Sequence, residues 1–455
     1  SQNRSSELIE YADVFRDEPL LSELPQGGKV ISEESFPATG VKLWTLSNGA
    51  KVYVKPTDFK NDELTLRSFS FGGRALSSEE DYVHAVQAVR LAQDCGLGAF
   101  NKTELTKKLA DKIVWVSPWI GRFEEGITGS CSPQDLETMF QLIYLYSTAP
   151  NFSDQSYRSW YNKRATSLRD RALDPEDCFA DSVAYLMQDR HFRARPQDMQ
   201  MLDAFDPVKG ARFFRQRFAN LGDFVWVFVG NYDEAELKRL CEIYLGNIVP
   251  NSKPESVIDD GMRTRAGKYD FVMRKGIADK ALVRVVSSKL QDYNPQVGLR
   301  ISLAGSLASE KLRENIREAR SGVYYVYCYG YGNSFPLPET NVYMGLGCST
   351  DRVDELLEAS FATLDSLKAG NFDEKYVNTV RQSKLKEMES DLQRNDWWAD
   401  KIYQQAYYGV PVDAILEEAE IIKNINRESL AADLRAYFDL DVNRQVFVLY
   451  PEEKP

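Results

Sequence analysis

The sequence predicts an α+β protein made of two tandem copies of one α/β sandwich domain. The first observation is that strand patterns cluster at both ends of each copy, with long helical patterns between them, which favours helices against a mixed sheet over a regular βαβ array. The second is a repeat: Asn151-Phe152 and Asn371-Phe372 each precede a helical stretch, and 220 residues separate them. The same separation places the predicted helix cap Asp206 on Asn426, and the strand VWVFV on QVFVL.

The elements of the first copy follow from periodicity and turn signals. A short helix is predicted over 6–15, before a polar passage rich in Pro and Gly, and Asn48-Gly49 predicts a hairpin between two strands. Alternation of apolar and polar residues marks later strands, and a period of 3.6 marks helices. The predicted strands span residues 63–71, 113–120, 126–130 and 224–229. The predicted helices span residues 81–94, 135–146, 153–173 and 178–188.

Three segments are expected along the chain. Residues 1–40 are predicted to be an N-terminal linker arm, residues 41–250 the first domain and residues 260–455 the second. The join, Val249 to Gly261, has the sequence VPNSKPESVIDDG and is predicted to be a polar linker.

Composition excludes several classes of protein. The net charge is −12 and no Lys/Arg run occurs, which argues against a nucleic-acid partner. No apolar run reaches the length of a membrane span. The six cysteines are scattered without a CxxC pair, so free, buried thiols are expected.

Few catalytic signatures occur in the sequence. His84 and His191 are the only histidines, and either is expected to be a surface or core residue. The chain has no P-loop, GxGxxG, EF-hand loop or GxSxG motif. No local motif therefore identifies an enzyme.

The stretch LRENIREARSGVYYVYCYGY, Leu312 to Tyr331, is predicted to be a helix end, a glycine turn and a strand. Gly322 stands where a helix C-terminus needs a left-handed residue. Arg317 and Tyr324 flank the turn, where a guanidinium and a phenol are able to converge on one oxygen. The alternative is that the arginines form a solvated helix face and the tyrosines an amphipathic sheet surface. The expected helix face carries Arg313, Arg317 and Arg320, and the expected strand faces carry Tyr325, Tyr327, Tyr329 and Tyr331 on one side and Tyr324, Val326 and Cys328 on the other.

Four segments give the sequence a resemblance to the non-catalytic C-terminal half of M16 (pitrilysin/insulinase-type) zinc metallopeptidases. They are LSNGAKVYVKPTDFKNDE, SFGGR, SPQDLETMFQLIYLYSTAP and IREARSGVYYV, and the resemblance runs from about Leu43 to the end of the chain. It implies two LuxS/metallopeptidase-like domains that form one half of a clamshell, which closes around a peptide.

The resemblance also implies that the zinc site of the family is degenerate here. The family binds zinc through HxxEH on the helix after the SFGG strand, and the Glu activates the metal-bound water. His84 retains one position of that motif, but Gln87 replaces the base and Ala88 the second ligand. The helix of the third ligand, around residues 160–170, contains no glutamate. The chain is therefore expected to bind no metal and to have no catalytic residue of its own, and zinc is expected in a partner half.

In the family, an Arg and a Tyr spaced as R-x6-Y reach the substrate near the metal, and Arg317 and Tyr324 have that spacing. The chain is thus expected to be the substrate-binding, non-catalytic half of a zinc metalloendopeptidase, with the zinc-bearing half upstream in the same polypeptide or on a separate subunit, and a peptide as substrate. The alternative is a catalytically dead homologue that acts as a scaffold or interaction subunit. A third alternative is an enzyme with an unfamiliar site. The resemblance favours the periplasm or cell envelope, with the cytoplasm as the alternative.

Overall fold

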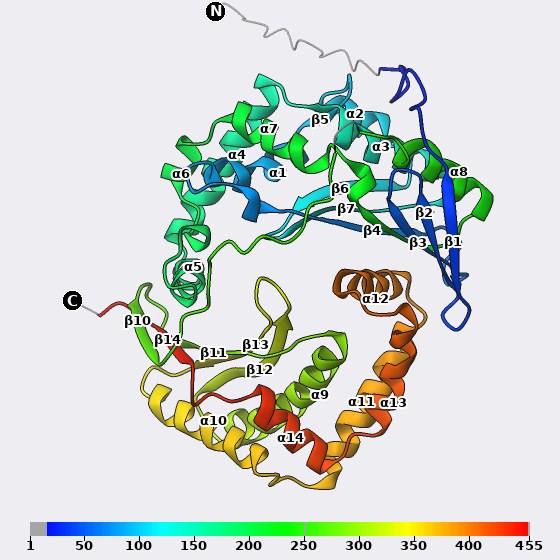
Figure 1. The fold of residues 1–455 in the computed structure, drawn as a ribbon. Helices are drawn as coiled ribbons and strands as arrows, with labels where there is room; N and C mark the ends of the chain where they lie inside the picture. Colours follow the sequence, from blue (N-terminus) through cyan, green and yellow to red (C-terminus); the bar gives the residue numbers. More distant parts are fainter. Residues whose placement is uncertain (1–15, 250–251, 454–455) are drawn as a thin grey trace, which may run out of the picture.

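The computed structural model describes residues 16–249 and 252–453, so the helix predicted over 6–15 lies outside the described part. The described strands form two large sheets whose inner faces look toward each other across the centre of the molecule (Figure 1). Most helices cover the outer faces of these sheets, while α5 (Pro175–Met187) and α12 (Asn395–Tyr408) lie between them. This α+β arrangement confirms the predicted fold class.

The sheet of the first unit has the strand order β1-β2-β3-β9-β4-β7-β6 in the described residues, and only β3 and β9 pair in parallel. Its strands are β1 (Val30–Phe36), β2 (Val41–Leu46), β3 (Lys51–Pro56), β4 (Leu64–Phe71), β6 (Val114–Ile120), β7 (Glu124–Cys131) and β9 (Val225–Gly230). The short strands β5 (Gly96–Leu97) and β8 (Pro150–Asn151) pair separately. The helices besides α5 are α1 (Tyr82–Asp94), α2 (Lys102–Lys108), α3 (Leu136–Thr148), α4 (Asp154–Leu173), α6 (Met199–Asp203), α7 (Pro207–Phe218) and α8 (Glu234–Leu245).

The sheet of the second unit has the order β10-β14-β11-β13-β12, again with one parallel pair, β10 and β14. This order matches β3-β9-β4-β7-β6 of the first unit strand for strand, as a duplication requires. The strands are β10 (Tyr269–Arg274), β11 (Ala281–Leu290), β12 (Val323–Asn333), β13 (Glu339–Cys348) and β14 (Arg444–Tyr450). The helices besides α12 are α9 (Pro295–Leu312), α10 (Val353–Lys368), α11 (Glu374–Asp391), α13 (Glu418–Lys423) and α14 (Arg427–Tyr437).

Local signals in the sequence set several of these boundaries. The hairpin between β2 and β3 turns at Gly49, whose φ of 97° suits glycine because a side chain would be strained there. Asp206 begins α7 by accepting a hydrogen bond from the amide of Val208, and Asn426 begins α14 through a capping box with Ser429. The predicted caps, which stand 220 residues apart, are thus confirmed.

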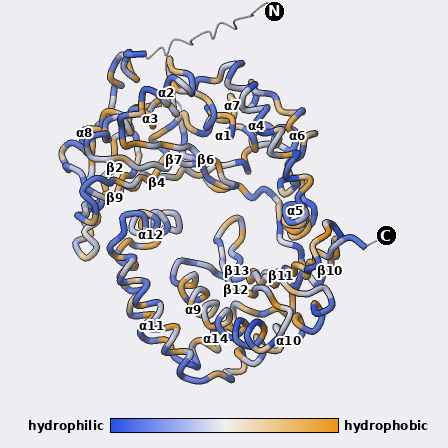
Figure 2. The backbone as a smooth tube through the Cα atoms, turned by 180° about the vertical axis from the view of Figure 1, so that it is seen from behind, coloured by the Kyte–Doolittle hydropathy of each residue, from blue (hydrophilic) through white to orange (hydrophobic). Residues whose placement is uncertain are grey.

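Each unit has its own core between its sheet and its outer helices. Trp44, Phe140 and Phe228 are fully buried in the first core, and Leu307 and Phe438 are fully buried in the second. The outer helices alternate between hydrophilic and hydrophobic segments along the tube, as amphipathic helices on a sheet must (Figure 2).

The two inner helices cross over to the opposite unit. Helix α12 comes after α9, α10 and α11 of the second unit in the chain, but it packs on the first sheet. Its Trp398 and Ile402 contact Val227 of that sheet. Conversely, Phe179 of α5 packs against Leu282 of the second sheet, among other residues. Helices α5 and α12 begin 220 residues apart, so they are equivalent elements that the two units exchange. This reciprocal packing joins the units through buried apolar surface.

The segment between the units is held by charges on the first unit. Arg217 donates two hydrogen bonds to Glu255, at 2.6 and 3.1 Å, and Arg122 forms a fork with Asp260 at 2.8 and 2.5 Å. The Asp260 side chain is fully buried. Bidentate Arg–carboxylate pairs are the strong ones, so the described part of the predicted linker is anchored along the first unit.

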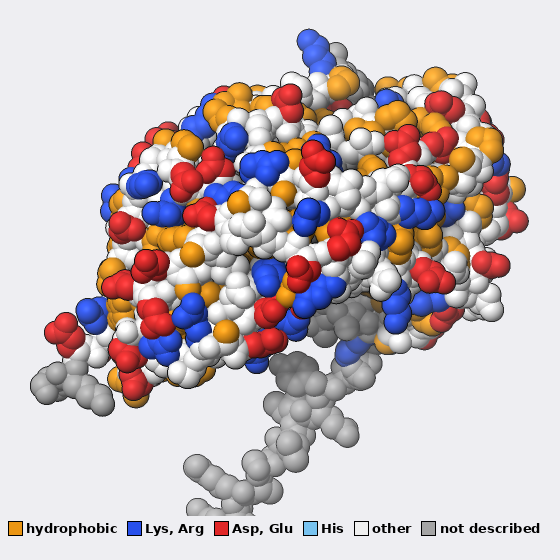
Figure 3. All heavy atoms as spheres, turned by 90° about the horizontal axis from the view of Figure 1, so that it is seen from below, with side chains coloured by type: hydrophobic (Ala, Val, Ile, Leu, Met, Phe, Trp, Pro, Cys, Tyr) orange, Lys and Arg blue, Asp and Glu red, His pale blue; other side chains and the backbone are white. Residues whose placement is uncertain are grey.

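Residues 30–36, which the sequence places in the linker arm over 1–40, form the edge strand β1, paired with β2. Among the described residues, no helix combines the length and apolarity needed to cross a bilayer. On the face formed by the outer side of the second unit, acidic and basic side chains are interspersed and no basic patch stands out (Figure 3).

Candidate functional site

The predicted helix–turn–strand segment exists, with an irregular helix end. Helix α9 continues into a π-helical turn over Arg313–Glu318, and Gly322 has a φ of 75° before β12 begins at Val323. The left-handed Gly322 is as predicted. π-helical turns widen a helix by one residue and occur frequently at functional sites, so the backbone around Arg317 is locally specialised.

The three arginines of this segment differ in what they contact. Arg313 pairs with Glu310 at 2.6 Å and Arg320 pairs with Glu355 at 3.4 Å. Arg317 is exposed and makes no hydrogen bond or ion pair with any residue in the described part of the chain. Arg317 is therefore the one arginine of the three whose charge is available to a ligand.

Tyr324 is displaced from the regular strand by a β-bulge. The pairing of β12 with β13 passes from Val323↔Cys348 to Tyr325↔Gly347, so Tyr324 is the extra residue. Its side chain is 52% exposed, and its hydroxyl forms no hydrogen bond with a described residue. No hydrogen bond joins Tyr324 to Arg317. Both groups lie unpaired on either side of one turn.

The remaining tyrosines of β12 form a stacked ladder on the inner face of the second sheet. The centroids of neighbouring rings from Tyr325 to Tyr331 lie 5.9, 6.2 and 6.1 Å apart, which bears out the predicted shared face. Arg284 of β11 donates to the hydroxyl of Tyr325 at 3.0 Å, and Tyr343 of β13 stacks on Tyr329 at 5.5 Å. The sequence pattern does not reveal Arg284 and Tyr343 as members of the ladder, because their place in it depends on strand order.

His84, on the degenerate motif of α1, is occupied by a structural contact. Its Nδ1 accepts a hydrogen bond of 3.1 Å from the backbone amide of Asp206, the residue that caps α7. The side chain is only 7% exposed, and burial lowers the pKa of the imidazole. A neutral His84 links α1 to α7, and of the two expected roles, surface or core, the structure shows the core one.

The other positions of the degenerate motif are filled by an amide network and an apolar contact. Gln87 is fully buried and donates to Gln197 at 3.0 Å, and Arg164 of α4 donates to the same Gln197 oxygen. Arg164 lies on the helix where the family carries its third ligand. Burial, with repulsion from Arg90 next, lowers the pKa of Arg164 to about 10. Ala88 is fully buried in the core.

A cation at this position opposes binding of a second cation, so the residues present do not fit a zinc ion. Within residues 16–249 and 252–453, no group of three or more His, Cys, Asp or Glu side chains is placed to hold a metal.

Comparison with known proteins supports the family resemblance. Residues 211–384 match the family model described as the Peptidase M16 inactive domain. The zinc protease PQQL-like of Arabidopsis thaliana is 24% identical over 437 residues, which cover 91% of this chain and 43% of that protein. The probable zinc protease PqqL of Escherichia coli is 22% identical over 98% of this chain and 48% of its own length. The chain thus spans about half the length of these curated relatives.

A solved structure has the same fold. The periplasmic protease PqqL from Escherichia coli superposes with a TM-score of 0.85 at 20% identity, covering 98% of this chain and 49% of that one. Together with the family model, these matches confirm the resemblance to the inactive, C-terminal half of M16 peptidases. The relatives are zinc proteases by name, and the domain that this chain matches is the inactive one.

Proposed function

We propose that this chain is the substrate-binding, non-catalytic half of an M16 zinc metalloendopeptidase. It closes with a zinc-bearing half, in the same polypeptide or on a separate subunit, around a peptide or unfolded protein. The zinc and the HxxEH motif belong to that other half. The observation that carries the proposal is the unpaired Arg317 and Tyr324, at a π-helical turn and a β-bulge, in a chain that resembles the inactive M16 half.

The chemistry of this pair suits a developing oxyanion. A guanidinium and a phenol are both donors, and their hydrogen bonds strengthen as a carbonyl oxygen gains negative charge. Neither donor forms a hydrogen bond with a residue in 16–249 or 252–453, so neither must break such a bond before it reaches a substrate. A donor of this kind accounts for roughly 10²–10³ in kcat in other hydrolases.

The test is reconstitution with the HxxEH-bearing half, with peptide cleavage as the readout. Arg317→Ala and Tyr324→Phe are expected to lower kcat by roughly 10²-fold each while binding of the two halves is retained. Arg320→Ala and Tyr329→Phe are matched controls on the same helix end and strand, because Arg320 is paired with Glu355 and Tyr329 belongs to the ladder.

If Arg317→Ala and Tyr324→Phe leave turnover unchanged in the reconstituted enzyme, the proposed role of this pair in catalysis is refuted. The alternative role of the chain as a scaffold is then favoured. Elemental analysis of the chain alone is expected to find no stoichiometric zinc. One tightly held equivalent would contradict the proposed division of labour.

The periplasm or cell envelope is the proposed location. The support is that the similar PqqL of Escherichia coli is described as periplasmic. Fractionation of cells into periplasm and cytoplasm, with detection of this chain, tests it, and recovery in the cytoplasmic fraction would overturn it.

A further inference from the structure

An aromatic cleft of about 460 Å³ opens at the junction of the two units, where α12 faces the start of β7. Its walls include Glu124 of β7 and four aromatic residues of α12, namely Trp397, Tyr403, Tyr407 and Tyr408. The hairpin between β12 and β13 reaches up toward this place (Figure 1), and its Phe335 packs edge-on against Tyr407 at 5.7 Å. Both units therefore build the cleft.

The aromatic wall is held in place by further ring contacts. Tyr403 and Tyr407 stack at 6.0 Å with an interplanar angle of 11°, and Phe69 of β4 supports Tyr403 at 5.0 Å. Burial raises the pKa of both tyrosines, so their rings stay neutral phenols. The face of an aromatic ring attracts a cation, and in this wall the ammonium of Lys401 lies 5.5 Å from the centroid of the Trp397 ring.

Of the charged residues that line the cleft, Glu124 is the one that forms no ion pair with a described residue. Lys401 pairs with Glu418 at 2.6 Å, and Asp400 pairs with Arg67 at 2.7 Å. The Glu124 carboxylate accepts a hydrogen bond of 3.1 Å from the hydroxyl of Tyr407, but forms no ion pair with a described lysine or arginine.

Burial raises the pKa of Glu124, although the hydrogen bond from Tyr407 and the charge of Arg74 act in the opposite direction. A cation bound beside the carboxylate would further stabilise its charged form.

We propose that this cleft binds a basic side chain of a peptide, with arginine as the preferred residue. A guanidinium is planar, so it is able to stack on an aromatic ring of the cleft while two of its N–H groups point at the Glu124 carboxylate. The overall charge of −12 favours the approach of basic peptides over acidic ones.

A neighbouring cleft of about 300 Å³ shares Trp397, Lys401 and Gln404 with the first. The residues next to the bound arginine therefore have room to continue along α12. The source of the peptide rests on the proposed function, whereas the binding site is a property of this chain alone.

The experiment measures binding to the full chain, without the zinc-bearing half, by calorimetric titration. The probes are two unstructured peptides of alanine, glycine and serine that differ at one position, arginine in one and citrulline in the other. Citrulline keeps the planar shape and removes the charge. The arginine peptide is expected to bind at least about tenfold more tightly. Equal binding of the two peptides, or binding of neither, would overturn the proposal.

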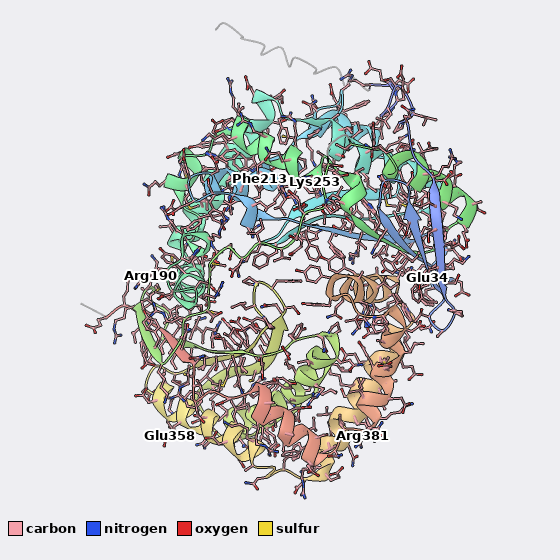
Figure 4. The ribbon with its side chains drawn as sticks, viewed as in Figure 1. Glu34, Arg190, Phe213, Lys253, Glu358 and Arg381 are labelled. Atoms are coloured by element: carbon pink, nitrogen blue, oxygen red, sulfur yellow. The ribbon has the colours of Figure 1, made fainter. Side chains whose placement is uncertain are left out.

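Variants separate the site from the general acidity of the chain. Glu124→Gln is expected to abolish the preference for arginine, whereas Glu358→Gln makes the same change of charge on the outer helix α10, away from α12 (Figure 4), and is expected to leave it intact.

Trp397→Leu is a second variant should Glu124→Gln fail to fold, and is expected to weaken the arginine peptide roughly twofold to thirtyfold. A preference for the arginine peptide that persists in both Glu124→Gln and Trp397→Leu would refute the proposed arginine site. These outcomes do not depend on cleavage, so they stand apart from the test of Arg317 and Tyr324.

Discussion

A buried carboxyl group next to the interdomain segment makes the stability of the first unit depend on pH. Glu125 of β7 is fully buried, and its Oε2 accepts a hydrogen bond of 2.7 Å from the amide of Gly73. Its Oε1 has no hydrogen-bond partner and lies 3.8 Å from Arg217, which is itself bound to Glu255. Burial raises the pKa of Glu125 from 4.5 to about 8, although Arg217 opposes the shift.

The sign of the effect follows from proton binding. The folded state holds the proton more tightly than the unfolded state, so the stabilisation is fully present below pH 4.5 and is lost as the pH rises to about 8. The free energy of unfolding is expected to fall by about 1.4 kcal/mol per pH unit in this window. The whole window, from 4.5 to about 8, corresponds to about 5 kcal/mol.

Glu125→Gln tests this reasoning, because an amide accepts the Gly73 hydrogen bond but does not titrate. Urea unfolding of both proteins, followed from about pH 5 to about pH 8, gives the difference in unfolding free energy. The wild-type protein is expected to lose stability relative to Glu125→Gln steadily over that range. A difference that stays constant, or that grows in favour of the wild type as the pH rises, would refute the buried, protonated Glu125.

Three further predictions concern packing, the interdomain segment and the thiols. Trp398→Ala is expected to destabilise the protein by about 3–5 kcal/mol in urea unfolding, because it empties the contact between α12 and the first sheet. Asp260→Asn is expected to speed proteolysis near residue 260, since it weakens the fork with Arg122; an unchanged rate would argue against anchoring. A thiol reagent is expected to modify Cys178 quickly and the five buried cysteines only on unfolding, because their thiols lie out of reach. Cys178→Ser should remove the fast phase.

The features that the sequence predicted correctly are those that interactions between neighbouring residues determine. Helix caps at Asp206 and Asn426, the hairpin at Gly49 and the left-handed Gly322 all depend on a few neighbouring residues. The repeat also carried over to three dimensions, because equivalent sequence patterns form equivalent elements, including α5 and α12.

The site depended on non-local features that the sequence analysis did not supply. Alternation placed Tyr324 on the face of the buried Cys328, whereas Tyr324 lies at a bulge and its side chain is half exposed. The tyrosine ladder, by contrast, has a counterpart in the sequence of β13, where glycines leave room for the rings. A Cβ atom at Gly347 would meet the ring of Tyr325 at 2.4 Å. Likewise, Trp397, Lys401, Gln404 and Tyr408 recur at helical spacing, but the exchange of α12 between units decides what that stripe faces.

In the degenerate metal position of the first unit, a buried hydrogen-bond network and core packing occupy the places of the motif residues. Restoring the motif through Gln87→Glu and Ala88→His would place a charged carboxylate in the fully buried position of Gln87 and a larger side chain in the core position of Ala88. Arg164 would still hold a positive charge beside Gln197, on the helix that carries the third ligand in the family. Hydrogen bonds occupy the position of the metal site, so a variant that binds zinc would need this network replaced as well as the motif residues. By contrast, Arg317 and Tyr324 are free of internal partners among the described residues, which is the condition that a donor to a substrate must meet.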